Sequence, residues 1–154
     1  MSRVHVVDGW RIDVTVRPGA KRVISGPAIA RIVAAALVAA GAPRPAGLSV
    51  LLTDDAELAE LNETHLGHLG PTDVLSFPLL PAAAFPPHEG ASQRDGASTS
   101  PVPFALPPGM PVQLGDIAVS VERAIAQATE GRGGQTGNVR WGVASEMRLL
   151  LTHG

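Results

Sequence analysis

The residue best suited to chemistry stands near the end of the chain, where His153 closes the segment WGVASEMRLLLTHG at residues 141–154. Apolar residues recur in this segment at the spacing of one buried helix face: Val143, Met147, Leu150 and Leu151. The segment therefore predicts an amphipathic helix that carries His153 on the same side as its apolar face. Taken alone, an imidazole in such a place is more often a satisfied core or surface histidine than a metal ligand.

His65 and His68 offer a rival metal-binding pair with the spacing H-x-x-H. Gly67 lies between them and Gly70-Pro71 follows, so His68 is predicted to lie outside the helix that carries His65. This arrangement favours a helix end and a loop over a pair of metal ligands.

Three further segments, together with the closing L-T-H-G, resemble the YbeY family of rRNA-maturation endoribonucleases. These segments are Leu61-Asn62, the block GPTDVLSFP at residues 70–78 and the block LGDI at residues 114–117. The last helix of that family carries a motif of the form H-G-x-L-H-L-x-G-Y-D-H. Its three histidines, spaced H-x3-H-x5-H, hold a zinc ion. The resemblance covers roughly residues 48–154.

The resemblance implies that His153 is the first of three zinc ligands and that the other two lie beyond Gly154. Histidines at i and i+4 share a helix face, and three protein ligands leave the fourth zinc position to a water molecule. Zinc lowers the pKa of such a water to about 7. We expect the intact protein to hold one Zn²⁺ ion. We also expect this chain to be cut within the motif, to lose zinc and to be inactive alone.

The polar residues of the matching blocks are candidates for a pocket or for structural roles: Asn62, Thr72, Asp73, Ser76 and Asp116. Their alternative is turn chemistry and strand ends. The family usually carries an arginine four residues after the asparagine of the L-N pair, and this sequence has Leu66 there. A leucine cannot bind phosphate as a guanidinium does, so either substrate binding is weakened or another cation replaces the arginine. No general acid or base can be assigned. Glu146 is a candidate contact to the metal region. The alternative is that it lies on a solvated face of the helix.

The composition indicates one cytoplasmic domain that does not associate with a membrane. The chain has 154 residues, of which 45% are hydrophobic, and it has no cysteine. Its first residues lack the apolar segment of a secretory signal, and the most apolar run, residues 32–40, is too short to span a bilayer.

The net charge of −2 argues against indiscriminate nucleic-acid binding, but the charges are unevenly distributed. Residues 1–46 hold seven basic and two acidic groups, whereas residues 47–154 hold five basic and twelve acidic groups. Such asymmetry is typical of a basic face that meets phosphate, or of an ordinary solvated surface.

Periodicity predicts a single α+β domain over residues 1–154, in which a small mixed β-sheet is covered by helices. The resemblance adds a zincin-like, metal-dependent hydrolase architecture. The predicted strands are residues 4–7, 12–16, 48–52, 74–77 and 114–120, and the predicted helices are residues 27–40, 55–65, 121–129 and the last segment. Residues 79–112 hold eight of the fourteen prolines and are predicted to form a mobile insertion. Residues 131–137 form a glycine-rich link without phosphate-loop spacing.

Local signals predict turns, caps and buried faces. Asp8-Gly9 is a turn signal between the first two strands, and residues 48–52 have the apolar run of an interior strand. The first helix is assigned mainly to the core by its continuous apolar stripe; Ser25 or Gly26 is expected to cap its start, and Gly41 to end it. Asp54 and Glu57 have the spacing of a capping pair for the second helix, Leu58 is expected to face the sheet, and Asn138 can cap the last helix.

The function that the resemblance implies is a zinc-dependent, single-strand-specific endoribonuclease of 16S rRNA 3′-end maturation and ribosome quality control. Its partners would be rRNA and the small ribosomal subunit. A second hypothesis is a non-catalytic ribosome-assembly or RNA-binding factor, which Leu66 slightly favours. A third is a zinc hydrolase of another class, such as a peptidase. The peptidase pattern H-E-x-x-H is not matched, because Gly154 follows His153.

Overall fold

A β-hairpin opens the chain. Strand β1 (Ser2–Val7) pairs antiparallel with β2 (Trp10–Val16). The two residues between them, Asp8 and Gly9, have φ angles of 51° and 89°. Two-residue hairpin loops of this kind require positive φ at both positions, so the turn predicted from Asp8-Gly9 is confirmed. The computed structural model describes residues 1–70, 72–80, 112–130 and 143–153.

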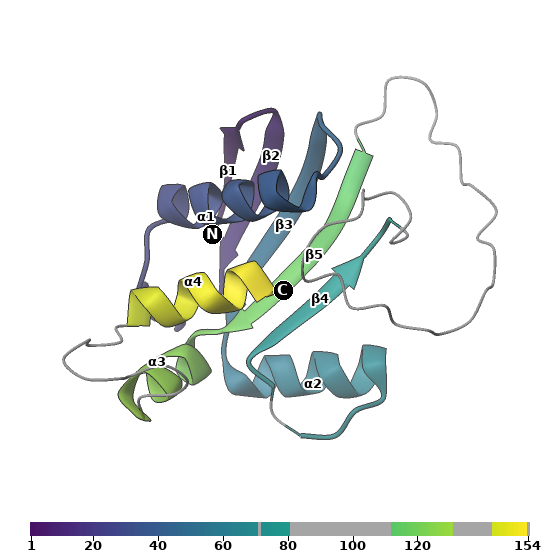
Figure 1. Ribbon diagram of the computed structural model, residues 1–154. Helices are drawn as coiled ribbons and strands as arrows, with labels where there is room; N and C mark the ends of the chain where they lie inside the picture. The colour runs from purple at the N-terminus through teal and green to yellow at the C-terminus, as the bar shows by residue number, and fades with distance from the viewer. Residues whose placement is uncertain (71, 81–111, 131–142, 154) are drawn as a thin grey trace.

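Five strands form one mixed sheet in the order β1-β2-β3-β5-β4 (Figure 1). Strand β3 (Ala46–Thr53) lies between β2 and β5 (Val112–Ser120) and is parallel to both. Strand β4 (Val74–Pro78) is an edge strand that pairs antiparallel with β5. The predicted α+β class with a mixed sheet and an interior strand at residues 48–52 is confirmed.

Helices α1 (Gly26–Ala40), α2 (Asp55–Leu66), α3 (Val121–Glu130) and α4 (Val143–His153) lie close to their predicted positions. The hydroxyl of Ser25 accepts a hydrogen bond from the backbone N–H of Ala28 at 3.3 Å, which caps α1 at its start. Gly41 ends α1 with a φ of 65°, a left-handed conformation that suits glycine.

The helices cover both faces of the sheet. Helices α1 and α4 lie together on one face (Figure 1), where the main core is formed. Helix α2 packs on the other face, where Leu58 contacts a smaller cluster with Leu75 and Ala118. The predicted orientation of Leu58 towards the sheet is therefore confirmed. On α4, the predicted buried face includes Met147, Leu150 and Leu151.

The predicted capping pair of α2 forms in only one direction. The carboxylate of Asp54 accepts a hydrogen bond from the backbone N–H of Glu57 at 2.9 Å. The carboxylate of Glu57, however, binds the guanidinium of Arg17, with Nη2–Oε1 at 2.7 Å, and also accepts a hydrogen bond from Thr53. A charged donor forms a stronger hydrogen bond than the backbone amide of Asp54 does. This ion pair ties the end of β2 to the first turn of α2.

The Arg17–Glu57 contact predicts a pH-dependent contribution to stability. Hydrogen bonds from Arg17 and then Thr53 hold the pKa of Glu57 below its ordinary value of 4.5. A lowered carboxyl pKa stabilises the fold at pH values above the unfolded pKa, and this stabilisation is lost as the pH falls through the folded pKa. We expect Glu57→Gln to have a lower midpoint of thermal unfolding than wild type at pH 7. The difference between the two midpoints should become smaller below about pH 4.5. Glu60→Gln, at an exposed position on the same helix, is the matched control. A difference between wild type and Glu57→Gln that stays constant from pH 7 to pH 3 would contradict the prediction.

Some predictions fall on residues outside the described ranges. These are the insertion, apart from residues 79, 80 and 112, the glycine-rich link at residues 131–137 and the expected cap at Asn138. Within the described ranges, no helix combines the length and hydropathy that crossing a membrane requires.

Candidate functional site

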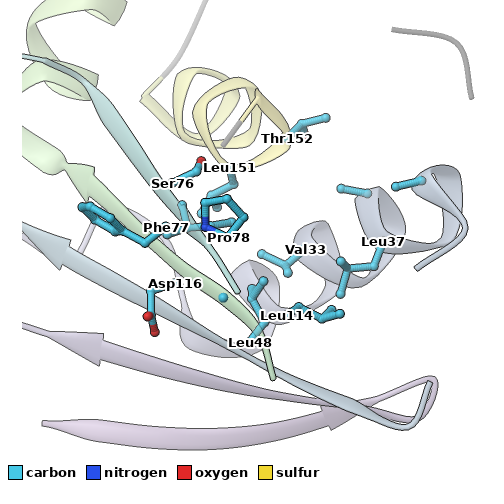
Figure 2. Close-up of a pocket in the computed structure, with 14 residues that line it drawn as sticks. Val33, Leu37, Leu48, Ser76, Phe77, Pro78, Leu114, Asp116, Leu151 and Thr152 are labelled. Atoms are coloured by element: carbon cyan, nitrogen blue, oxygen red, sulfur yellow. The ribbon is translucent and has the colours of Figure 1, made fainter. Parts of the chain in front are cut away.

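The sequence blocks that suggested a function meet at one end of the sheet. The block at residues 70–78 supplies edge strand β4, and the block at residues 114–117 lies in β5. The two strands pair in a register that sets Phe77 opposite Asp116 and Pro78 opposite Gly115. The last turn of α4 lies beside them (Figure 2). Segments about 40 and 80 residues apart in the sequence therefore share one site.

A pocket of about 220 Å³ occupies this junction (Figure 2). Its walls come from α1, β3, β4, β5 and α4 and are mainly apolar: Val33, Ala36, Leu37, Ala40, Leu48, Phe77, Pro78, Leu114, Gly115, Ile117 and Leu151. Its polar members are Ser76, Asp116 and Thr152. The pocket can therefore take a flat apolar group, with hydroxyls at its edge. Sequence reasoning assigned the α1 residues only to the core, because a continuous apolar stripe does not separate buried positions from a pocket wall.

His153 is the last residue of α4 and follows Thr152, which lines the pocket. The side chain of His153 is outside the described part of the structure. Among the described residues, no group of three or more His, Asp or Glu side chains could hold a metal ion. These residues therefore do not form a zinc site by themselves. Glu146 also has no described side chain.

Ser76 and Asp116 both reach this pocket, but they differ in direction. Ser76 is exposed on β4 and lies beside Leu151 of α4 (Figure 2). The carboxylate of exposed Asp116 points away from α4 (Figure 2). Successive side chains of a strand alternate between the two faces, and Asp116 follows that rule between buried Gly115 and Ile117. Asp116 also lines a second cavity on the α2 face, next to His65 and Arg17.

Asp73 and Thr72 hold the start of β4. The carboxylate of Asp73 accepts a hydrogen bond from the side-chain amide of Gln127 at 3.1 Å, and its backbone carbonyl accepts one from the N–H of Ser120 at 2.9 Å. The hydroxyl of Thr72 donates to the carbonyl of Val74 at 3.3 Å. Asp73 thus connects β4 to the end of β5 and to α3.

The Leu-Asn pair supports the end of α2 and the loop that follows it. Asn62 is buried, and its side-chain amide donates to the carbonyl of Gly70 at 3.3 Å. Leu66, at the position of the usual family arginine, is the last residue of α2, and 44% of its surface is exposed. A longer side chain can therefore be accommodated there.

The rival histidine pair is separated by the end of α2. His65 packs its ring against Phe77 in a T-shaped contact, with ring centroids 5.4 Å apart. Gly67 ends the helix with a φ of 67°, and exposed His68 follows it, so the predicted helix boundary is confirmed.

Comparisons with known proteins agree with these motifs. Residues 23–154 match the model of a family described as "Endoribonuclease YbeY". A protein of that name from Roseiflexus castenholzii is 35% identical over 143 residues, which cover 93% of this chain and 73% of the relative. Another from Symbiobacterium thermophilum is 39% identical over 94 residues, covering 61% of this chain and 49% of the relative. A third, from Chelativorans sp., is 38% identical over 124 residues, covering 79% and 62% of the two chains.

The family match covers most of the chain and includes every block that meets at the pocket. The helix that ends at His153 and both strands of the β4–β5 pair lie inside the matched residues. This chain belongs to the YbeY family of endoribonucleases.

Proposed function

We propose that the protein is a zinc-dependent endoribonuclease that cuts single-stranded RNA in 16S rRNA 3′-end maturation and in ribosome quality control. Its partners are then rRNA and the small ribosomal subunit, and its location is the cytoplasm. The observation that carries the proposal is the junction of β4, β5 and the end of α4 around one pocket, inside the family match.

The pocket supports a preference for single strands. An unpaired base can leave its stack and pack its flat face on apolar or aromatic side chains, whereas the bases of a duplex are held inside the helix. Pro78 and Leu151 offer such a surface, and the hydroxyls of Ser76 and Thr152 lie at the same pocket. These residues are proposed to bind and orient the RNA next to the end of α4.

The proposed zinc ligand on this chain is His153, with two further histidines after Gly154 as the resemblance implies. A catalytic zinc ion uses three protein ligands, and when bound it supplies a water molecule of lowered pKa. On this proposal the 154 residues alone do not retain zinc. Elemental analysis that finds one tightly bound zinc ion per chain would contradict the assignment of ligands.

Cleavage assays on the protein from the complete reading frame test the function. Matched single-stranded and double-stranded RNAs are compared with and without a chelator. We expect cleavage of the single strand only, and loss of cleavage with chelator. Cleavage that resists the chelator would exclude the metallo-nuclease.

A non-catalytic RNA-binding or ribosome-assembly factor is the second candidate, because Leu66 replaces the usual arginine. RNA binding without cleavage by the complete protein would favour it.

Leu66→Arg provides a direct test of the missing guanidinium. The side chain at this position is partly exposed at the end of a helix, so the substitution is tolerated and places a phosphate-binding group where the family usually has one. We expect single-stranded RNA to bind several-fold more tightly, measured by fluorescence anisotropy. Leu66→Gln is the control, since it removes the apolar side chain without adding charge. An affinity of Leu66→Arg equal to that of Leu66→Gln would show that position 66 does not face the RNA.

A further inference from the structure

A groove, separate from the two cavities already described, runs along the outer surface of the domain between helices α1 and α4. The two helices lie side by side in front of the sheet (Figure 1), and the groove between them, which is open to solvent, has a volume of about 660 Å³. Alanines from both helices, Ala36 among them, form much of its walls, and its polar members are Arg31, Ser145, Arg148 and Thr152. We call this feature the α1–α4 groove.

The charge of the α1–α4 groove has one sign. Arg31 and Arg148 are its charged members, and no acidic side chain is among the described residues that line it. Both arginines are exposed, and neither takes part in the ion pairs found within the described ranges. Other arginines are engaged: Arg17 binds Glu57, and Arg44 lies over the ring of Trp10 at 4.6 Å. The guanidinium groups of the groove are thus available to a ligand from solution.

The groove leads to the candidate site. Ala36 and Thr152 line both the α1–α4 groove and the pocket at the β4–β5 junction. Arg148 and Thr152 are four residues apart on α4, which sets them one above the other on the same helix face. The hydroxyl of Thr152 donates to the carbonyl of Arg148 at 2.8 Å. A ligand that follows the groove from Arg148 therefore arrives at the last turn of α4, which ends at His153.

We propose that the α1–α4 groove binds the phosphate backbone of the RNA substrate, with Arg31 and Arg148 as the phosphate-binding residues. A guanidinium binds phosphate through paired N–H donors, and the alanines on both helices let a backbone approach closely. The two arginines would supply phosphate-binding groups on the sheet face that α1 and α4 cover, opposite the face that α2 covers. This inference rests on the proposed function, because it assumes that the ligand of the pocket is RNA. Arg31 and Arg148 are positioning residues, since they bind the strand beside the pocket.

The test measures binding of a labelled, unstructured single-stranded RNA to the full chain by fluorescence anisotropy at several salt concentrations. Each neutralised phosphate contact contributes about 0.7 to the slope of log K against log salt for single strands. We expect Arg31→Gln and Arg148→Gln each to weaken binding about fivefold or more, and the double variant to reduce the slope by about 1.4. Arg31→Lys with Arg148→Lys should restore most of the slope, because the charge is kept. Both side chains are exposed, so the thermal unfolding midpoint should stay close to that of wild type.

Arg11→Gln is the matched control. Arg11 is exposed on β2 between buried Trp10 and Ile12, so strand alternation sets it on the sheet face opposite α1 and α4. If Arg31→Gln and Arg148→Gln bind RNA as Arg11→Gln does, the groove is not the RNA path, although the proposed function stands. If the wild-type protein from the complete reading frame binds no single-stranded RNA, the groove and the proposed function both fail. An acidic peptide that binds in an Arg148-dependent way, while RNA binding does not change, would identify a protein ligand and overturn the proposal.

Discussion

Replacement of Gly115 by alanine is expected to destabilise the fold by about 3 kcal/mol or more. Gly115 has a φ of 145° and lies at a β-bulge, where Leu114 is left without a partner on β3. A methyl group added to Gly115 would stand 3.0 Å from the Cα of Pro78 and closer still to the carbonyl oxygen of Phe77. Both obstacles belong to the backbone of β4, so they cannot be relieved by a side-chain rotation. Urea unfolding of the variant measures the effect.

Gly19→Ala is the control for Gly115→Ala. Gly19 also has a positive φ, 91°, but apart from its chain neighbours no atom of the described residues lies within 4 Å of the added methyl group. Gly19→Ala should therefore lower the free energy of unfolding by the conformational penalty of alanine alone, about 1–2 kcal/mol. Equal destabilisation by the two substitutions would show that β4 does not approach Gly115 as closely as described. The comparison thus tests the β4–β5 contact that forms one wall of the pocket.

Leu151→Ala is expected to destabilise the fold by about 3 kcal/mol, within the range of buried leucine truncations. Only 2% of the side chain is exposed, and it packs in the main core between α4 and the sheet while lining the pocket. The substitution removes buried apolar surface and leaves a cavity beneath the last turn of α4. Since His153 follows two residues later, the same change should loosen the helix end that the proposed function requires.

Leu69→Ala is the control for Leu151→Ala. Leu69 is 82% exposed, so its truncation should change the free energy of unfolding by less than about 0.5 kcal/mol. Denaturant unfolding of both variants gives the difference directly. If Leu151→Ala lowers the free energy of unfolding no more than Leu69→Ala does, α4 is not packed on the sheet.

Local elements were predictable wherever their signals lie within a few residues. Asp8-Gly9 specified the hairpin turn, and Ser25 and Gly41 bounded α1 as expected. Asp54 likewise precedes α2 as its cap, and its carboxylate accepts the hydrogen bond from the backbone N–H of Glu57, as predicted. The Glu57 half of the same capping pair was wrong, because Arg17, forty residues earlier in the chain, provides a stronger partner.

The site was only partly predictable. The motif blocks identified the family, and that prediction is confirmed by the comparisons. The roles assigned to individual residues stay predictions. Within the described ranges, Asn62 and Asp73 make structural hydrogen bonds, and Asp116 directs its carboxylate away from α4. Arg31 and Arg148 were not singled out, because they are 117 positions apart and no sequence pattern connects them.

The sequence by itself determined the helices, the strands, the turns and the family. These depend on backbone preferences, caps and periodic burial, which are local signals set by residues close together in the sequence. Only the tertiary structure decided that β5 enters the sheet between β3 and β4, that α1 contributes a pocket wall, and that two distant arginines share a groove. Such neighbours are chosen by the packing of the whole domain, where many weak contacts between distant residues act together.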